Sequence, residues 1–361
     1  MARPNQAWLN LEALRNNLAL ARGLAPHSKV MAVVKANAYG HGALTVAQTL
    51  DPLVDALAVA CIEEAEELRD ANIAAPILLL EGLFEAAELH IAAERNFWIT
   101  IDNIDQLQWL EAAQISQSVH CWLKLDTGMH RLGVDPALAG SFYHRLKGCR
   151  NVHDDLVLST HFASADDLEK RQTKEQLDQF NSACRDMPGE RSAANSAGTL
   201  AWPDSHFDWI RPGYMLYGNS PMTSNHPNAI SLQPVMTLTS AVISLRTVAI
   251  GEAVGYGATW LAQRPSRIAT VCIGYGDGYP RLAPAGTPVL VNGQRAPLAG
   301  RVSMDMITVD VTDLAGVKIG DEVVLWGEGL PVGEVAQHAG TIGYELTTRM
   351  PARTPRTVRV S

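Results

Sequence analysis

Short apolar runs alternate with stretches of helical spacing over roughly the first two thirds of the chain, and this alternation limits the folds open to it. The apolar runs cover 29–34, 56–60, 76–80, 97–101, 119–125 and 156–160, and another begins at Trp209. Between them apolar residues recur at helical spacing, as at Ile62, Ala65 and Leu68. Such alternation is typical of parallel βα units.

Polar residues follow several of these predicted strands. Lys35 ends the first apolar run and is followed by a glycine-rich turn, and His161 and Arg211 follow two later runs. The carboxyl ends of parallel strands meet at the mouth of a closed barrel or in the crevice of an open sheet, where α/β enzymes keep their catalytic groups. A lysine at a strand end is more often a solvated charge, so position alone does not assign a function to Lys35.

The composition changes after Tyr217. Residues 218–228 are rich in Ser, Pro and Asn, which is typical of a linker. The runs 235–248, 268–273, 288–291, 307–311 and 322–326 are apolar or alternating and are split by turn residues, and helical spacing returns only at 333–339. We therefore predict two domains, 1–228 and 229–361, and allow for the first few residues joining the second one.

Composition excludes several classes of function. The formal net charge is −9 and basic runs are missing, which argues against a nucleic-acid surface. No stretch is apolar and long enough to span a bilayer and the N-terminus lacks a signal-peptide pattern, so we expect no membrane partner and a cytoplasmic protein. The five cysteines are an odd number without a CxxC pair, so we expect neither disulfides nor a metal site.

The segment Lys-Ala-Asn-Ala-Tyr-Gly-His-Gly, residues 35–42, resembles the cofactor-lysine motif of alanine racemases that depend on pyridoxal 5′-phosphate (PLP). The resemblance extends over nearly the whole chain. It implies an α/β fold with an N-terminal (β/α)8 TIM-type barrel and a mostly β C-terminal domain. It also implies that Lys35 binds PLP covalently and that Tyr39 lies near the phosphate. The remaining cofactor positions are matched by Asn195, Ser196, Gly213, Tyr214 and Tyr344.

Four further residues match positions around the cofactor ring. Arg211 matches the arginine that faces the pyridine nitrogen, and His161 matches a histidine that lies against the ring. Arg131 resembles an arginine near the cofactor's phenolic oxygen and the substrate carboxylate. Lys124 resembles a lysine that carries a carbamate in many members. An always-charged arginine disfavours protonation of the pyridine nitrogen, so Arg211 should limit transamination, and an Arg211→Glu variant should gain that activity.

The second domain supplies the other half of the implied site. Tyr256 matches the second catalytic base, Met304 and Asp305 match a carboxylate-binding loop, and Tyr275 matches an entrance gate. In the family these residues reach the partner's cofactor, which implies a homodimer with shared sites. Without the resemblance Tyr256 would not be chosen, because a tyrosine between glycines is more often a turn anchor.

The resemblance predicts racemisation of L- and D-alanine by a two-base mechanism, with Lys35 on one face and Tyr256 on the other. The product would supply peptidoglycan precursors, or the enzyme would degrade D-alanine. Two alternatives are a PLP-dependent decarboxylase of the same architecture, which would need an acid in place of Arg211, and a non-catalytic PLP carrier, which would not need the second domain. The sequence departs from some relatives at Ser192 and Ser303, where they carry histidine and cysteine.

Overall fold

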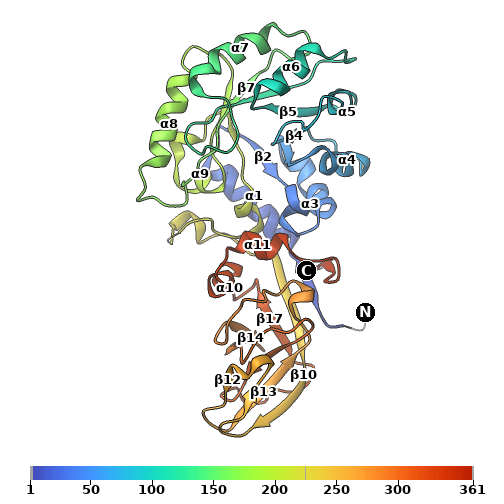
Figure 1. The fold of residues 1–361 in the computed structure, drawn as a ribbon, viewed down its shortest axis with the longest axis vertical. Helices are drawn as coiled ribbons and strands as arrows, with labels where there is room; N and C mark the ends of the chain where they lie inside the picture. The colour runs from blue at the N-terminus through green and yellow to red at the C-terminus, as the bar shows by residue number, and fades with distance from the viewer. Residues whose placement is uncertain (1–2, 224, 360–361) are drawn as a thin grey trace.

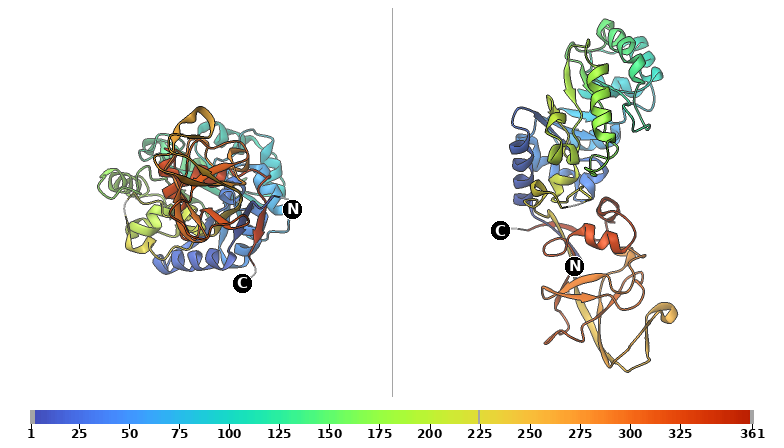
Figure 2. Two further views of the ribbon diagram at one scale, coloured as in Figure 1. Left: turned by 90° about the horizontal axis from the view of Figure 1, so that it is seen from below. Right: turned by 90° about the vertical axis from the view of Figure 1, so that its left-hand side faces the viewer.

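The computed structural model describes residues 3–223 and 225–359, so the first two residues and residue 224 of the predicted linker lie outside it. Two parts follow one another along the long axis of the molecule (Figure 1). A barrel surrounded by helices forms one part and a mostly β region forms the other. Figure 2 shows the same end-to-end arrangement from another side, with the barrel part above the β part in its right-hand view. Within the described residues, no helix is both long and apolar enough to cross a membrane.

The first part is a closed parallel barrel, which confirms the predicted fold class. Each strand pairs in parallel with the next, and the last pairs with the first. The strands are β2 (Lys29–Val33), β3 (Ala56–Val59), β4 (Ile77–Leu79), β5 (Phe97–Ile101), β6 (Cys121–Lys124), β7 (Val157–Ser159), β8 (Glu190–Ser192) and β9 (Trp209–Ile210). The helices in this part are α1 (Leu11–Leu24), α3 (Ala43–Leu50), α4 (Ile62–Asp70), α5 (Glu88–Glu94), α6 (Ile104–Ala112), α7 (Ala139–Gly148), α8 (Gln172–Ala183) and α9 (Ser196–Ala201).

Two apolar layers hold the barrel together. Inside it, side chains that alternate along the strands pack on one another, with Trp122 and Trp209 as the largest members. A larger cluster lies outside the strands and includes buried residues of the helices, such as Leu14, Leu68 and Phe180. A barrel filled in this way is a packed core, so ligands are left to its ends.

Two local features differ from the sequence-based expectations. The strand β8 has the sequence Glu-Arg-Ser, and without an apolar run it was not predicted. The stretch 194–198 consists of small and polar residues that are typical of a turn, and it contains the start of α9. The Asn195 side chain accepts a hydrogen bond from the Gly198 amide at 2.9 Å and caps this helix.

The turn after β2 is left-handed. In α2 (Lys35–Tyr39) the residues Ala36, Asn37, Ala38 and Tyr39 have φ between 52° and 54°. This conformation costs roughly 1–2 kcal/mol for each residue that is not glycine. The surrounding contacts hold it, since the Asn37 side chain accepts from the Ala43 amide at 2.7 Å. Backbone strain of this kind is concentrated at functional sites, and here it follows directly on Lys35.

The second part is built on a sheet in which β1 (Gln6–Leu9) takes part. That strand pairs antiparallel with the long β10 and parallel with β18, so the chain's first strand lies in the sheet of the second part. The domain bounds 1–228 and 229–361 themselves remain a prediction. The strands of this part are β10 (Met236–Val248), β11 (Ala253–Val254), β12 (Trp260–Leu261), β13 (Ser266–Val271), β14 (Pro288–Val291), β15 (Gln294–Pro297), β16 (Ile307–Asp310), β17 (Glu322–Trp326) and β18 (Arg356–Val358).

Two short helices, α10 (Val332–His338) and α11 (Gly343–Thr348), lie at the junction with the barrel (Figure 1). α11 contacts the left-handed turn α2. Nearby, the Arg356 guanidinium donates to the Gly40 carbonyl at 3.0 Å. The second part therefore packs against the end of the barrel where Lys35 emerges.

Candidate active site

A cavity of about 910 Å³ opens at the carboxyl ends of the barrel strands. Its volume lies in the range of ordinary ligand sites. Both parts of the chain contribute to its wall, because Ile342, Tyr344 and Thr348 of the α11 region line it together with barrel residues. The predicted site residues in its wall are Lys35, Tyr39, Lys124, Arg131, His161, Asn195, Ser196, Arg211, Gly213, Tyr214 and Tyr344.

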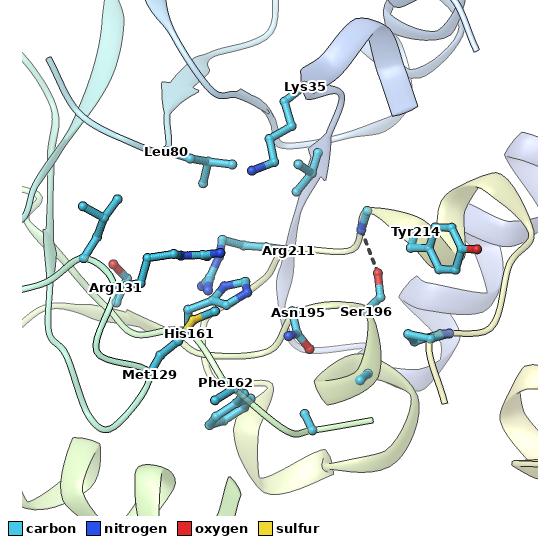
Figure 3. A pocket seen from close by; sticks show the side chains of 18 of the residues that line it. Lys35, Leu80, Met129, Arg131, His161, Phe162, Asn195, Ser196, Arg211 and Tyr214 are labelled. Carbon is cyan, nitrogen blue, oxygen red and sulfur yellow. Dashed lines mark hydrogen bonds between the residues drawn. The ribbon is translucent and has the colours of Figure 1, made fainter. Parts of the chain in front are cut away.

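Lys35 lines the cavity just beyond the carboxyl end of β2. Its amine points into the space that Arg131, His161 and Arg211 face from the other side (Figure 3). The Nζ atom lies 4.0 Å from a carboxylate oxygen of Glu81, which also lines the cavity. The side chain is about one third exposed, which leaves the amine accessible to a ligand.

Arg211 is buried, and both terminal nitrogens of its guanidinium form hydrogen bonds. Its guanidinium donates to the Ser192 hydroxyl and, at 2.6 Å, to the Thr160 carbonyl. Burial lowers the pKa of Arg211 to about 10, which still leaves it charged at neutral pH. Ser192 therefore supports the arginine with a neutral oxygen, so the cation has no counter-charge from this residue.

The His161 ring is neutral. Burial holds its pKa well below the ordinary value, and the positive charge of Arg211 lowers it further. Its backbone carbonyl accepts from the Gln176 side chain at 3.0 Å. A neutral imidazole can both accept and donate a proton.

Lys124 at the end of β6 is also deeply set. Burial lowers its pKa to about 8, and the Arg211 charge acts in the same direction. Asp102 partly offsets this effect, and burial raises the pKa of Asp102 itself. One oxygen of that carboxylate, Oδ2, has no hydrogen-bond partner among the described residues. Carbon dioxide reacts with the neutral form of an amine, and a lowered pKa increases the share of Lys124 in that form.

One side of the cavity is lined by hydroxyl groups and by backbone that other groups can approach closely. The Ser196 Oγ accepts from the amides of Gly213 at 2.9 Å and Met215 at 3.3 Å (Figure 3). A Cβ on Gly213 would lie 2.5 Å from the Tyr39 hydroxyl oxygen, so glycine is what lets that tyrosine approach. Tyr214 stacks on Tyr344 with ring centroids 3.6 Å apart. Small residues, amides and hydroxyls suit a phosphate, so these residues fit the phosphorylated end of PLP.

Four other predicted site residues of the second part, Tyr256, Tyr275, Met304 and Asp305, lie outside this cavity, whereas Tyr344 lines it. Tyr256 is 70% exposed and Met304 is 53% exposed, and neither lines the cavity. Tyr275 is also exposed and is not in the wall. Asp305 forms an ion pair with Arg353, which lowers its carboxyl pKa. The predicted site is therefore only partly assembled by one chain.

Sequence reasoning missed several residues that shape the site. The Glu64 carboxylate accepts from the Ala36 amide at 2.7 Å and from the Ala60 amide at 2.8 Å, which fixes the start of the left-handed turn. Glu81 and Thr160 lie in the wall. Glu81 directly follows the predicted run 76–80, so the strand-end position that drew attention to Lys35 was also the signal available for Glu81. Thr160 is the last residue of the run 156–160.

Comparison with known proteins gives a consistent result. The model of the alanine racemase N-terminal domain matches residues 9–221, and that of the alanine racemase C-terminal domain matches residues 235–358. The biosynthetic alanine racemase of Escherichia coli K12 is 52% identical over 96% of both chains. The alanine racemase of Aeromonas hydrophila is 53% identical over 96% of this chain and 97% of its own.

Solved structures agree with this. The biosynthetic alanine racemase of Pseudomonas aeruginosa superposes with a TM-score of 0.96 at 50% identity, covering 99% of this chain and 100% of the other. The alanine racemase of Bartonella henselae, described with covalently bound pyridoxal phosphate, superposes with a TM-score of 0.91 at 30% identity, covering 99% of this chain and 100% of the other. The chain belongs to the alanine racemase family.

Proposed function

We propose that this protein interconverts L- and D-alanine with PLP as its cofactor. The observation that carries the proposal is the convergence of Lys35, His161 and Arg211 on one cavity, in a chain whose relatives at 52% identity are alanine racemases. The relative described with covalently bound pyridoxal phosphate supports the choice of cofactor. Membership of this family also favours racemisation over the decarboxylase and carrier alternatives.

The proposed cofactor residues divide by chemistry. Lys35 would hold PLP covalently through Nζ. Ser196, Gly213, Tyr214 and Tyr344 would hold its phosphate, with Tyr39 near it. The other proposed cofactor residues are Arg131, His161, Asn195 and Arg211. When bound, PLP supplies an electron sink that makes the Cα proton of an amino acid acidic.

Two bases on opposite faces of the substrate explain inversion. On one face the Lys35 amine takes or returns the Cα proton. On the other face we assign this role to Tyr256 of a second copy of the chain, since Tyr256 is exposed and lies outside its own cavity. A tyrosine can act as a base only after it has passed on its own proton. We assign this relay to His161, whose neutral ring has a nitrogen that can accept a hydrogen bond, and to the adjacent Arg211.

The substrate carboxylate needs a cation and donors. Arg131 supplies the cation from within the cavity. We assign the remaining contacts to Met304 and Asp305 of the second copy, with Tyr275 at the entrance. Lys124 would support Arg131 once it carries a carbamate, because a carbamate turns a buried cation into an anion beside an arginine.

The physiological direction is a separate part of the proposal. The relatives from Escherichia coli and Pseudomonas aeruginosa are both described as biosynthetic. We therefore propose D-alanine supply for peptidoglycan, in the cytoplasm, as the role of this chain.

The test is racemisation in D2O starting from each enantiomer separately, with wild type and Tyr256→Phe. The wild type should invert both enantiomers. The variant should lose proton abstraction from L-alanine and still exchange the Cα proton of D-alanine, because Lys35 remains. Tyr143→Phe is a matched control, since its hydroxyl donates to the Pro188 carbonyl and it does not line the cavity. Normal racemisation by Tyr256→Phe would reject the second base, and an inactive wild type would reject the function.

A further inference from the structure

Three potential metal ligands meet at the end of the barrel opposite the cavity. His120 directly precedes β6, whose other end carries Lys124, and His153 and Asp155 precede β7, which leads to His161. One ligand atom from each of the three lies within 4.8 Å of the others. Within residues 3–223 and 225–359 this is the only group of three His, Cys, Asp or Glu side chains that meets this condition.

The three side chains already contact one another, and the two imidazoles must turn out of their stack before both can face one ion. The His120 Nδ1 lies 2.9 Å from the Asp155 carboxylate oxygens. The His120 and His153 rings stack in parallel, with centroids 3.9 Å apart and an angle of 9° between their planes. His120 is partly buried and the other two are exposed, so water and ions can reach the group.

The backbone that carries these side chains is fixed by barrel pairing. The His120 carbonyl accepts from the Ile99 amide of β5 at 2.9 Å, and the His153 amide donates to the Val119 carbonyl at 3.0 Å. The buried Asn151 side chain ties the preceding turn to the C-terminal end of α6, donating to the carbonyls of Leu110 at 2.7 Å and Ala113 at 2.9 Å. Sites on such rigid elements lose little entropy when a ligand binds.

The ligand types suit a metal as well. An ionised carboxylate only accepts, so the His120 Nδ1 donates to Asp155 in the present contact. An ion bound at Nδ1 takes the place of this hydrogen, and the proton of the neutral ring then lies on Nε2. Two imidazoles and one carboxylate are nitrogen and oxygen ligands typical of Zn²⁺, whereas Mg²⁺ and Ca²⁺ prefer oxygen alone.

We propose that His120, His153 and Asp155 bind one Zn²⁺ ion at the base of the barrel. A tetrahedral ion with bonds of about 2.0–2.2 Å holds its ligand atoms roughly 3.3 Å apart. Rotation of the exposed His153 side chain closes the distance from the present arrangement. Water completes the coordination. The ion joins the segments that enter β6 and β7, and at this end of a barrel its role is to stabilise the fold.

The test uses PLP-loaded enzyme treated with EDTA, dialysed, and titrated with ZnCl2 by calorimetry. The wild type should bind one Zn²⁺ per chain at a site whose affinity falls about tenfold or more in His120→Gln, His153→Gln and Asp155→Asn. His144→Gln, which removes an exposed histidine of α7, should keep it. Unchanged PLP absorbance and racemase activity in the variants would show that they fold.

Two further measurements separate this site from other Zn²⁺ binding. The thermal unfolding midpoint should rise with ZnCl2 in the wild type and in His144→Gln, and not in His153→Gln. Anomalous scattering at the zinc edge should place a peak among the three side chains. Equal Zn²⁺ affinity in wild type and the three variants, no Zn²⁺ retained by the wild type, or a peak only elsewhere would each overturn the proposal.

Discussion

The predicted site residues of the barrel lie together in one cavity, whereas most of those in the second part lie outside it. The barrel brings Lys35, His161 and Arg211 into one cavity and holds them with buried hydrogen bonds and backbone pairing. In the second part, Tyr256 and Met304 are exposed and lie outside that cavity. The difference teaches that one chain can preorganise the cofactor half of the site, whereas the other half needs a surface that a single chain does not supply.

The largest expected effect is the loss of Lys35. Lys35→Ala should lower kcat by about 10⁴-fold or more, because it removes the covalent anchor and one base together. Lys29→Ala is a matched control at the opposite end of the same strand, where Lys29 pairs with Glu190 on the surface. Steady-state racemisation of both enantiomers measures the effect. Comparable losses in both variants would mean that Lys35 acts through strand stability and not through chemistry.

The next prediction tests whether the second half of the site comes from another chain. Lys35→Ala and Tyr256→Phe chains, each carrying a different affinity tag, are co-expressed and the hybrid dimer is purified through both tags. One of its two sites then contains an intact Lys35 and an intact Tyr256. The hybrid should show about half of the wild-type activity, although each parent is nearly inactive.

The opposite result would be equally informative. A hybrid no more active than its parents would place both residues in a site within one chain and would break the comparison drawn above. Dilution offers an independent check, because activity per chain should decrease when the enzyme concentration is lowered below the dimer's dissociation constant. Constant specific activity in a demonstrated monomer would reject the shared site.

The barrel and its site could be predicted to the extent that they follow from strand periodicity. Buried parallel strands are continuous apolar runs, so 97–101 was predicted with the bounds that β5 has. The strand β8 was not predicted, because its three residues, Glu-Arg-Ser, form no apolar run. It is held in place by pairing with β7 and β9. A strand that depends on its neighbours cannot be recognised from its own residues.

Other features depend on contacts that are distant in sequence. The left-handed turn after Lys35 is fixed by Glu64, which lies 28 residues beyond Ala36. The proposed metal ligands were missed for a related reason, since Asp155 lies 35 residues beyond His120 and cysteine spacing was the only metal signal considered. Tyr256 was selected through family resemblance, because the physical reason for its importance would lie on another molecule.

A smaller effect is expected where Gly213 packs closely against Tyr39. Gly213→Ala places a Cβ 2.5 Å from the Tyr39 hydroxyl oxygen and should weaken PLP binding about tenfold, since overpacking costs about 1–3 kcal/mol. Gly23→Ala is the control, because a Cβ at this position in α1 has no atom within 4 Å. Titration of cofactor-free enzyme with PLP measures both affinities. Equal affinities would show that Tyr39 moves freely and that the phosphate side of the cavity is not preorganised.

The smallest effect concerns the burial of Lys124 and is read from the pH dependence of stability. Its pKa is about 8 in the folded chain and near 10.5 when unperturbed, chiefly because of burial. Between these values the unfolded state binds more protons, so the stability contribution of Lys124 should rise from pH 8 to pH 10.5. We therefore expect the unfolding midpoint of the wild type to rise relative to that of Lys124→Met between pH 8 and pH 10.5. The measurement uses cofactor-free protein in CO2-free buffer. Lys318→Met, an exposed lysine of the second part, should show no such shift. An equal pH dependence for both lysines would mean that the cavity end of β6 is hydrated, and the contrast between a preorganised barrel and an exposed second part would then weaken at this position.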